Sequence, residues 1–524
     1  MKKTITVLLA NIGFVLQVSG VFILLPIVAS FILGETDATI ALFLTATCFL
    51  ILGFFTNSFC EKKAMSSKQS STLMVLVFVI LGLIGSIPYL YLNVFTGDVF
   101  QRITDSLFES VSGFTTTGFS VIPDLSLLPK SIILYRALTQ FIGGLGIVIV
   151  LLAFFYPEAK LRDFAKSMGL SKKNQKIRRT FFFIISLYCL CTAILVSAGY
   201  VFGYHDIINL SSIVFSAMST GGFSPVNDIA PIITQSPMNL IIPIGMLLGA
   251  TNFLIFASLY RKKFKEFLNS ETIFFLIIIA IISGLVISYF SIPFYDASFH
   301  VISAMSSGGF SYLQIQNFSD SLKLLLISLM FIGGASLSTA GGIKIYRFLV
   351  LIKSFTKTVT FTIIGKENKM RLFGKNYSMV LFGKNDKLPL LGKNYSNGEV
   401  IQAGLMVLLT GALILVSSVI VCNYGFSNIN ALFECTSAIG NVGLSTGVAG
   451  PSLALELKWL FMVLMLVGRV EIMALFVIFA RTIERRNGHK ENKDSQPAET
   501  AESDGMAVSA FCELDKNNKT EDVE

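Results

Sequence analysis

The chain has 524 residues, of which 53% are hydrophobic and only 14% are charged. A soluble globular enzyme is excluded, because soluble proteins carry about 25% charged residues. Three of the apolar runs, 73–92, 180–202 and 400–421, are long enough to cross about 30 Å of hydrocarbon as helices. Such continuous runs also exclude an outer-membrane barrel, whose strands alternate apolar and polar residues. The composition therefore predicts an all-helical protein that crosses a membrane many times.

The distribution of the net charge of +9 along the chain predicts the topology. The chain enters an apolar run directly after Lys3 with no small-residue cleavage signal, so we expect a retained first helix. Lysine and arginine then gather in five loops, at 61–68, 160–179, 261–266, 344–393 and 481–486. The loops between them are nearly free of both residue types, at 34–37, 97–130, 203–237, 291–320 and 423–456. Because basic loops stay on the cytoplasmic side, we expect about ten spanning helices in the cytoplasmic membrane and a cytoplasmic amino terminus.

Four of the outward-facing stretches repeat a six-residue motif after an apolar stretch that is too short to span. The motifs stand at 115–120 (TTTGFS), 219–224 (STGGFS), 306–311 (SSGGFS) and 440–445 (GNVGLS). The fourth residue of every motif is Gly. At the same distance before this Gly, each unit has a Ser followed by a small residue, namely Ser112-Gly113, Ser216-Ala217, Ser303-Ala304 and Ser437-Ala438. The repeat predicts four tandem units around one pore, each with a spanning helix, a half-helix, a filter loop and a second helix.

These units define the expected domain boundaries. An amino-terminal helix pair occupies residues 1–68, and the four pore units occupy 69–179, 180–270, 271–397 and 398–486. The stretch 487–524 has ten acidic and four basic residues, so we expect a disordered cytoplasmic tail there. In the basic loop of the third unit, Gly-containing turns between short apolar pieces predict hairpins at 373–376, 382–385 and 391–394.

The four motifs have the chemistry of a cation filter. Non-helical backbone is tolerated at membrane depth only when it is buried in protein or lines a water-filled cavity. A Gly in the fourth position allows dihedral angles that turn successive carbonyls the same way, as filters require to replace an ion's hydration shell. A single Gly can instead serve close helix packing, but four at matching places favour a filter. The predicted ion-binding residues are Thr116, Thr117, Gly118, Thr220, Gly221, Gly222, Ser307, Gly308, Gly309, Asn441, Val442 and Gly443.

Two further features favour a cation over an anion in this pore. Each half-helix directs its carboxyl end, which carries a partial negative charge, toward the pore. Acidic residues are expected to add negative potential on the same side, namely Asp105, Glu109, Asp206, Asp296 and Glu434.

The second helix of the third unit is interrupted. Residues 333–342 contain four Gly and three hydroxyl residues, a composition that predicts a loop inside the membrane. A nucleotide-binding loop is disfavoured, because the segment lacks a Gly-Lys-Ser/Thr ending and a preceding strand. Arg469 in the last helix is an intramembrane charge, which marks function unless it only pairs with Glu471 or a carbonyl for structure. We expect Lys344 and Arg347 to extend to the cytoplasmic surface.

Three further segments complete the pattern, at 135–147 (YRALTQFIGGLGI), 333–344 (GGASLSTAGGIK) and 468–471 (GRVE). With these segments and the four motifs, the chain resembles the TrkH/KtrB/HKT superfamily of potassium transporters from its first helix to about residue 486. The extra helix pair before the first unit is more similar to TrkH than to the shorter KtrB. The fourth motif is the least regular, since Asn441 and Val442 stand where the second and third units have a hydroxyl residue and Gly.

The resemblance implies potassium uptake through a channel-like pore, with a potassium ion bound in the filter. It also implies that the intramembrane loop obstructs the path below the filter, with Arg469 opposite it. The implied gate residues are Gly334, Ser336, Ser338, Thr339, Gly341, Gly342 and Arg469. The implied partners are a second copy of the chain in a homodimer, membrane lipid and a cytoplasmic nucleotide-binding (TrkA-like) regulatory subunit.

Two other classes of function are open to the same sequence. A secondary carrier, either coupled to sodium or protons or transporting sodium, also uses broken helices, but its repeats usually come as two halves rather than four units. A membrane enzyme would need paired catalytic groups, whereas the histidines, His205, His300 and His489, show no metal-ligand spacing. We therefore expect no enzymatic activity, no cofactor other than the potassium ion and no nucleic-acid partner.

Overall fold

The structure is a computed structural model that describes residues 2–58, 67–154, 177–252, 271–336, 338–364, 370–372, 375–377, 387–390 and 393–472. The chain divides into two compact units, Met1–Val477 and Ile478–Glu524, and all described residues belong to the first. The tail at 487–524 and the basic loops at 61–66, 160–176, 261–266 and 481–486 lie outside the described residues.

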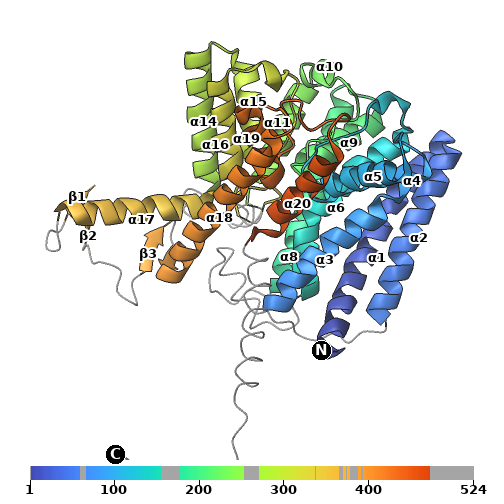
Figure 1. Cartoon of the computed structure of the whole chain (residues 1–524), viewed down its shortest axis with the longest axis horizontal. Helices are drawn as coiled ribbons and strands as arrows, with labels where there is room; N and C mark the ends of the chain where they lie inside the picture. The colour runs from blue at the N-terminus through green and yellow to red at the C-terminus, as the bar shows by residue number, and fades with distance from the viewer. Residues whose placement is uncertain are drawn as a thin grey trace, which may run out of the picture. The chain divides into compact units, whose positions relative to one another are not determined.

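The chain begins with two helices that lie side by side, α1 (Lys2–Leu33) and α2 (Thr36–Ser58) (Figure 1). Glycines allow their close approach, since a Cβ on Gly13 would lie 2.5 Å from Thr56 Oγ1 and one on Gly20 would lie 2.9 Å from Leu50 Cγ. Small residues are common where membrane helices pack together. The helix pair expected before the first pore unit is therefore present.

Four units follow, and each contains a half-helix of 12–16 residues between two other helices. The elements of the first unit are α3 (Ser67–Gly85), α4 (Ile87–Tyr91), the half-helix α5 (Val99–Phe114), η1 (Leu125–Leu127) and α6 (Lys130–Phe154). Those of the second are α8 (Ile177–Val201), the half-helix α9 (Ile207–Met218), α10 (Ala230–Ile233) and α11 (Met238–Ala250). The third has α14 (Glu271–Phe290), the half-helix α15 (Phe294–Ser306), η2 (Ile315–Asn317), α16 (Asp320–Ile332) and α17 (Ile345–Ile364), and the fourth has α18 (Asn397–Cys422), the half-helix α19 (Asn428–Ile439) and α20 (Leu455–Val470).

The units are arranged cyclically. In each unit, a helix that follows the motif packs against the half-helix of the next unit, in the pairs α6 with α9, α11 with α15, α16 with α19 and α20 with α5. The last of these pairs closes the ring, because α20 belongs to the fourth unit and α5 to the first. The predicted architecture, an all-α membrane protein with four tandem units and an amino-terminal helix pair, is confirmed.

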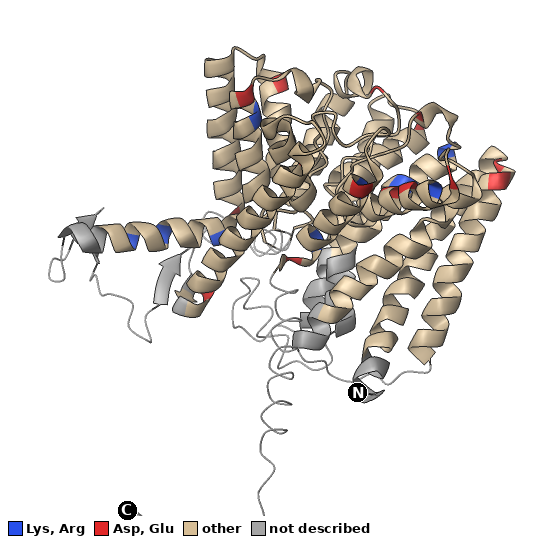
Figure 2. Cartoon of the chain, viewed as in Figure 1, with Lys and Arg blue, Asp and Glu red and all other residues tan. Residues whose placement is uncertain are grey.

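Five described helices are long and apolar enough to cross a membrane: Leu8–Leu33, Thr36–Ser58, Thr72–Tyr91, Glu271–Phe290 and Gly398–Cys422. Figure 2 shows that the bodies of α1, α2 and α14 are free of charge, whereas basic residues lie along α17. The expected total of about ten remains a prediction. Helices α11, α16 and α20 are shorter, at 13, 13 and 16 residues, and α16 ends where the glycine-rich segment begins.

Two small hairpins stand between α17 and α18. Strand β1 (Met370–Leu372) pairs antiparallel with β2 (Lys375–Tyr377), and β3 (Lys387–Leu390) pairs antiparallel with β4 (Lys393–Ser396). The hairpins predicted at 373–376 and 391–394 are therefore confirmed, and the one at 382–385 lies outside the described residues.

Candidate ion pathway

All four half-helices end in the same hydrogen-bonded turn. The Ser and small residue that precede each motif, here called the Ser-small pair, accept two backbone bonds from it. The N–H of the second motif residue donates to the carbonyl of the small residue, in the pairs Thr116–Gly113, Thr220–Ala217, Ser307–Ala304 and Asn441–Ala438. The amide of the third donates to the carbonyl of the Ser, over 2.8–2.9 Å, at Thr117–Ser112, Gly221–Ser216, Gly308–Ser303 and Val442–Ser437. These two bonds define the Schellman ending of a helix, which requires a left-handed residue just past its end. The repeat of the Ser-small pair thus has a local structural cause.

The left-handed residue of each turn is not a glycine. It is the second motif residue, with a φ of 55° at Thr116, 53° at Thr220, 57° at Ser307 and 49° at Asn441. The Gly in the fourth position is left-handed as well, with φ between 72° and 90° at Gly118, Gly222, Gly309 and Gly443. Each loop therefore has two left-handed residues separated by one residue, a backbone form that costs energy at the non-Gly positions and marks functional sites.

The fourth-position glycines join the loops into a closed ring. A Cβ added there would collide with the neighbouring loop, and the contacts run from Gly118 to Gly221, Gly222 to Gly309, Gly309 to Val442 and Gly443 to Thr117. Three of these approaches would place a carbonyl oxygen only 2.0–2.1 Å from the added Cβ. One chain thus closes a ring of four loops, and the twelve residues predicted to bind ions lie together in it.

Glycine occupies the third position in the second and third units for a different reason. A Cβ on Gly221 would lie 2.4 Å from Gln140 Cδ, and one on Gly308 would lie 2.3 Å from Met246 Sδ. The side chain of the preceding unit fills the space in each case. The first and fourth units have Thr117 and Val442 at this position instead.

The Ser at the end of the motif is held by the half-helix of its own unit in three of the four units. The contacts are Ser120 Oγ to the Glu109 carboxylate at 3.1 Å, Ser311 Oγ to His300 Nε2 at 3.2 Å and Ser445 Oγ to Glu434 Oε1 at 2.7 Å. The second unit has Ile213 at the matching place on its half-helix, and the Ser224 carbonyl accepts a bond from Arg136 instead.

Buried cations neutralise two of the acidic residues near the loops. Arg136 Nη2 lies 2.6 Å from Glu109 Oε1, and Lys458 Nζ lies 2.5 Å from Asp105 Oδ1. A third ion pair, between Lys130 and Asp206 at 3.5 Å, is exposed. These pairs reduce the negative potential expected from the five acidic residues. Of the other two, Asp296 accepts a bond from the Tyr312 hydroxyl, and Glu434 has only neutral partners among the described residues.

The glycine-rich segment is a loop, as predicted. Helix α16 ends at Ile332, and Gly333 and Gly342 are left-handed, with φ of 72° and 74°. Gly334 O accepts a bond from Ile345 N, so the two ends of the loop lie close together. Within it, Ser336 N donates to Glu271 Oε2 at 2.8 Å, and Ser338 Oγ donates to the Ala335 carbonyl.

This loop contacts the filter ring directly. Thr339 Oγ1 lies 3.2 Å from Thr220 Oγ1, and Gly341 N donates to Ser307 Oγ at 3.2 Å. A Cβ on Gly341 would lie 1.9 Å from the Gly440 carbonyl. Of the six predicted gate residues of the loop, Thr339 and Gly341 therefore lie against the motifs of the second, third and fourth units. The contacts of Gly334, Ser336, Ser338 and Gly342 described here are with other parts of the third unit or with α11.

Arg469 ties the loop to two other units. It is 3% exposed, and its guanidinium donates to Thr339 O at 2.9 Å and to Gly143 O of α6 at 2.6 Å. The sequence suggested either Glu471 or a backbone carbonyl as its structural partner, and the structure shows carbonyls. Glu471 instead binds Arg347 Nη2 at 2.8 Å. Arg347 is only 9% exposed, so the prediction that it extends to the cytoplasmic surface is wrong. Lys344 Nζ donates to the Ala340 carbonyl at the end of the loop.

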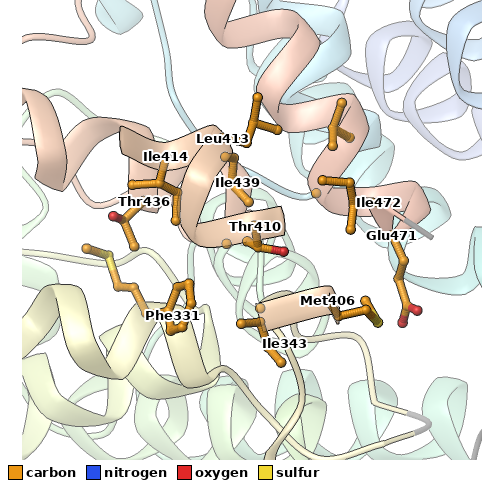
Figure 3. A pocket seen from close by; sticks show the side chains of 15 residues that line it. Phe331, Ile343, Met406, Thr410, Leu413, Ile414, Thr436, Ile439, Glu471 and Ile472 are labelled. Carbon is orange, nitrogen blue, oxygen red and sulfur yellow. The ribbon is translucent and has the colours of Figure 1, made fainter. Parts of the chain in front are cut away.

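A cavity adjoins the far end of the loop (Figure 3). Its walls come from Phe331 of α16, Ile343, Met406 of α18, Ile439 of α19 and Ile472. The lining is mostly apolar, with Thr410, Thr436 and Glu471 as its polar side chains. The loop is thus held on its filter side by hydrogen bonds and borders open space at Gly342 and Ile343.

Several contacts that hold the ring could not be predicted from neighbouring residues in the sequence. Gln140 and Arg136 stand in the segment 135–147, but nothing in the segment itself indicates that their partners are Gly221 and Glu109. Asn441 is also more than a substitute for a hydroxyl residue, since its Nδ2 donates to Thr117 Oγ1 at 3.0 Å and to Met465 O at 2.8 Å. Polar side chains from other helices were therefore the missing part of the site.

Comparison with known proteins places this geometry in a family. A sequence model of the TrkH family, described as a cation transport protein, matches residues 39–274 and 264–489. An uncharacterised cation transporter of Methanocaldococcus jannaschii is 30% identical over 493 residues, which cover 91% of this chain and 96% of the relative. The Trk system potassium uptake protein TrkH of Salmonella typhimurium is 28% identical over 81% of this chain and 88% of its own length.

The same fold occurs in a solved structure. The crystal structure of the potassium transporter TrkH from Vibrio parahaemolyticus superimposes with a TM-score of 0.74 over 90% of this chain and 98% of that one. The sequence identity is 23%. The residues that the family model matches include all four motifs and the glycine-rich loop.

Proposed function

Because the chain belongs to the TrkH family of cation transport proteins, we propose that it takes up potassium ions through the ring of its four filter loops. The family consists of multi-pass membrane transporters rather than enzymes. The observation that carries the proposal is the closed ring in which Gly118, Gly222, Gly309 and Gly443 each touch the next loop. Ring carbonyls would replace the hydration shell of the ion, so potassium is the bound ion and no other cofactor is needed.

Replacing Gly118 by Ser tests this function. Any side chain there is strained by the φ of 90° and would press on the Gly221 carbonyl, so we expect the ratio of potassium to sodium permeability to fall by at least about tenfold. The ratio is measured from reversal potentials of the purified chain in planar bilayers.

The matched control is Gly34→Ser in the turn between α1 and α2. Gly34 is also left-handed, with a φ of 72°, but an added Cβ would meet nothing within 4 Å. An unchanged ratio in Gly118→Ser, with the control also unchanged, would refute the filter assignment.

The alternative function is a secondary carrier. Four loops that close one ring support a pore, because carrier repeats usually form two halves. In reconstituted vesicles, a pore passes potassium down its own gradient when sodium and proton gradients are absent. Uptake that requires either of those gradients would establish the carrier.

We further propose that the protein is a homodimer in the cytoplasmic membrane, with its amino terminus and a TrkA-like nucleotide-binding subunit on the cytoplasmic side. Since each chain closes its own ring, each subunit should have a separate pore. A concatenated pair with one filter disabled by Gly118→Ser should therefore retain about half of the selective flux, as two independent pores would. Complete loss would indicate a shared pathway.

A further inference from the structure

Gln140 of α6 reaches out of the first unit and binds the filter loop of the second. It is fully buried, with 0% exposure. Its Nε2 donates to the Gly221 carbonyl at 2.7 Å. Its Oε1 accepts from Ser216 Oγ at 2.7 Å and from Phe223 N at 3.2 Å. One amide therefore holds the half-helix and both neighbours of Gly222.

The orientation of this amide is determined by its partners. The backbone N–H of Phe223 can only donate and the carbonyl of Gly221 can only accept, so the side chain between them must offer one acceptor and one donor. A carboxylate offers only acceptors, and a thioether offers no donor. Glutamine satisfies both groups at this length, and without it two buried backbone groups of the filter loop would lose their partners.

The second and fourth units have an apolar residue at the position equivalent to Gln140. Gly143, Gly249 and Gly468 are equivalent, because a Cβ on each would collide with the carbonyl of the last half-helix residue of its own unit. Three residues before them stand Gln140, Met246 and Met465. Met246 fills the space beside Gly308 as Gln140 does beside Gly221, but with no hydrogen bond between them. The amide is therefore specific to the contact between the first and second units.

We propose that Gln140 is a positioning residue that fixes the second filter loop and thereby sets the ion selectivity of the pore. The inference rests on the proposed function, since it assigns selectivity to the same ring. Gln140 acts through Gly221 and Phe223, because it holds the backbone on either side of Gly222 in one geometry. Without the hydrogen bonds of Gln140 the loop adapts to ions of different radius. Discrimination between potassium and other cations then falls, while conduction continues.

The test is Gln140→Met, which reproduces the residue found at the equivalent places. The permeability ratios of potassium, rubidium and sodium are measured from bi-ionic reversal potentials, together with unitary conductance and the melting temperature in detergent. We expect the potassium-to-sodium ratio to fall about tenfold, the effect of one buried hydrogen bond, with conductance retained. Ser216→Ala removes only the hydroxyl that orients the amide, and we expect a smaller fall of roughly threefold.

The matched control is Gln17→Met in α1. Gln17 is also an amide in a side-chain hydrogen bond, accepting from Asn57 Nδ2 at 3.0 Å, but its partner belongs to α2. Its variant should keep the wild-type ratios. Wild-type ratios in a folded Gln140→Met protein, or an equal loss in Gln17→Met, would overturn the proposal. If Gln140→Met does not fold, Ser216→Ala decides alone by the same criterion. A wild-type chain that shows no potassium preference refutes the proposed function instead, and thus the two failures are distinguishable.

Discussion

Replacing Arg136 by Met should strongly destabilise the native state. Arg136 is 1% exposed, and it donates to Glu109 Oε1 from Nε at 2.9 Å and from Nη2 at 2.6 Å. Its guanidinium also binds the Ser224 carbonyl and lies 4.2 Å from the centre of the Phe223 ring. Its removal leaves the Glu109 carboxylate buried without a counter-charge, which costs roughly 3–5 kcal/mol. The yield of folded protein and its melting temperature in detergent measure the effect.

A second substitution separates the effect of the unpaired Glu109 carboxylate from the effect of the packing lost with the Arg136 side chain. In Arg136→Met combined with Glu109→Gln, no charge is buried, so we expect the melting temperature to recover substantially. The control is Lys130→Met, which breaks the ion pair with Asp206 at 3.5 Å. Those side chains are 55% and 37% exposed, and such pairs contribute about 0–1 kcal/mol. The argument fails if Arg136→Met melts as Lys130→Met does, or if the double variant is no more stable than Arg136→Met.

The features that could be predicted from sequence are those encoded in neighbouring residues. The Ser-small pair and the motif after it form one hydrogen-bonded turn within a few residues, so their repetition located all four half-helix ends. The interruption of α16 is equally local, because glycines at both ends of the loop adopt left-handed conformations. Composition and spacing were sufficient for both.

The contacts between side chains of different helices could not be predicted in this way. Glu109 is 27 residues from Arg136, and Asp105 is 353 residues from Lys458. A count of acidic residues near the pore therefore overstated the negative potential, since the cations that neutralise it lie on other helices. The same reason explains Arg347, which finds Glu471 124 residues away instead of the surface. Even at two motif positions, Gly221 and Gly308, glycine is required because a side chain from another unit occupies the space beside it.

Replacing Arg469 by Ala should raise the potassium flux without changing selectivity. The guanidinium donates to Thr339 O of the loop and to Gly143 O of α6, and no described bond links it to a filter motif. Hydrogen bonds to charged groups contribute about 1.5–3 kcal/mol, so their loss from the closed state increases the open fraction by about tenfold or more. The loop keeps its bonds from Ala335 N to Ala250 O and from Thr339 N to Gly249 O, so it loosens without detaching. Open probability in single-pore recordings measures the change.

The proposed regulatory partner and the loop provide the controls for the proposed gate. A partner shifts the closed and open states only by its difference in affinity between them, so wild-type pores should open more often when the nucleotide-loaded subunit is bound. The Arg469→Ala pore should respond less, because its loop is already released toward the cavity beside Ile343. Arg102→Ala, an arginine that binds Asn93 at the exposed start of α5, should behave as wild type. If deletion of residues 336–339 leaves the open probability unchanged with and without the partner, the loop is only a packing element, and the higher flux of Arg469→Ala would need another cause.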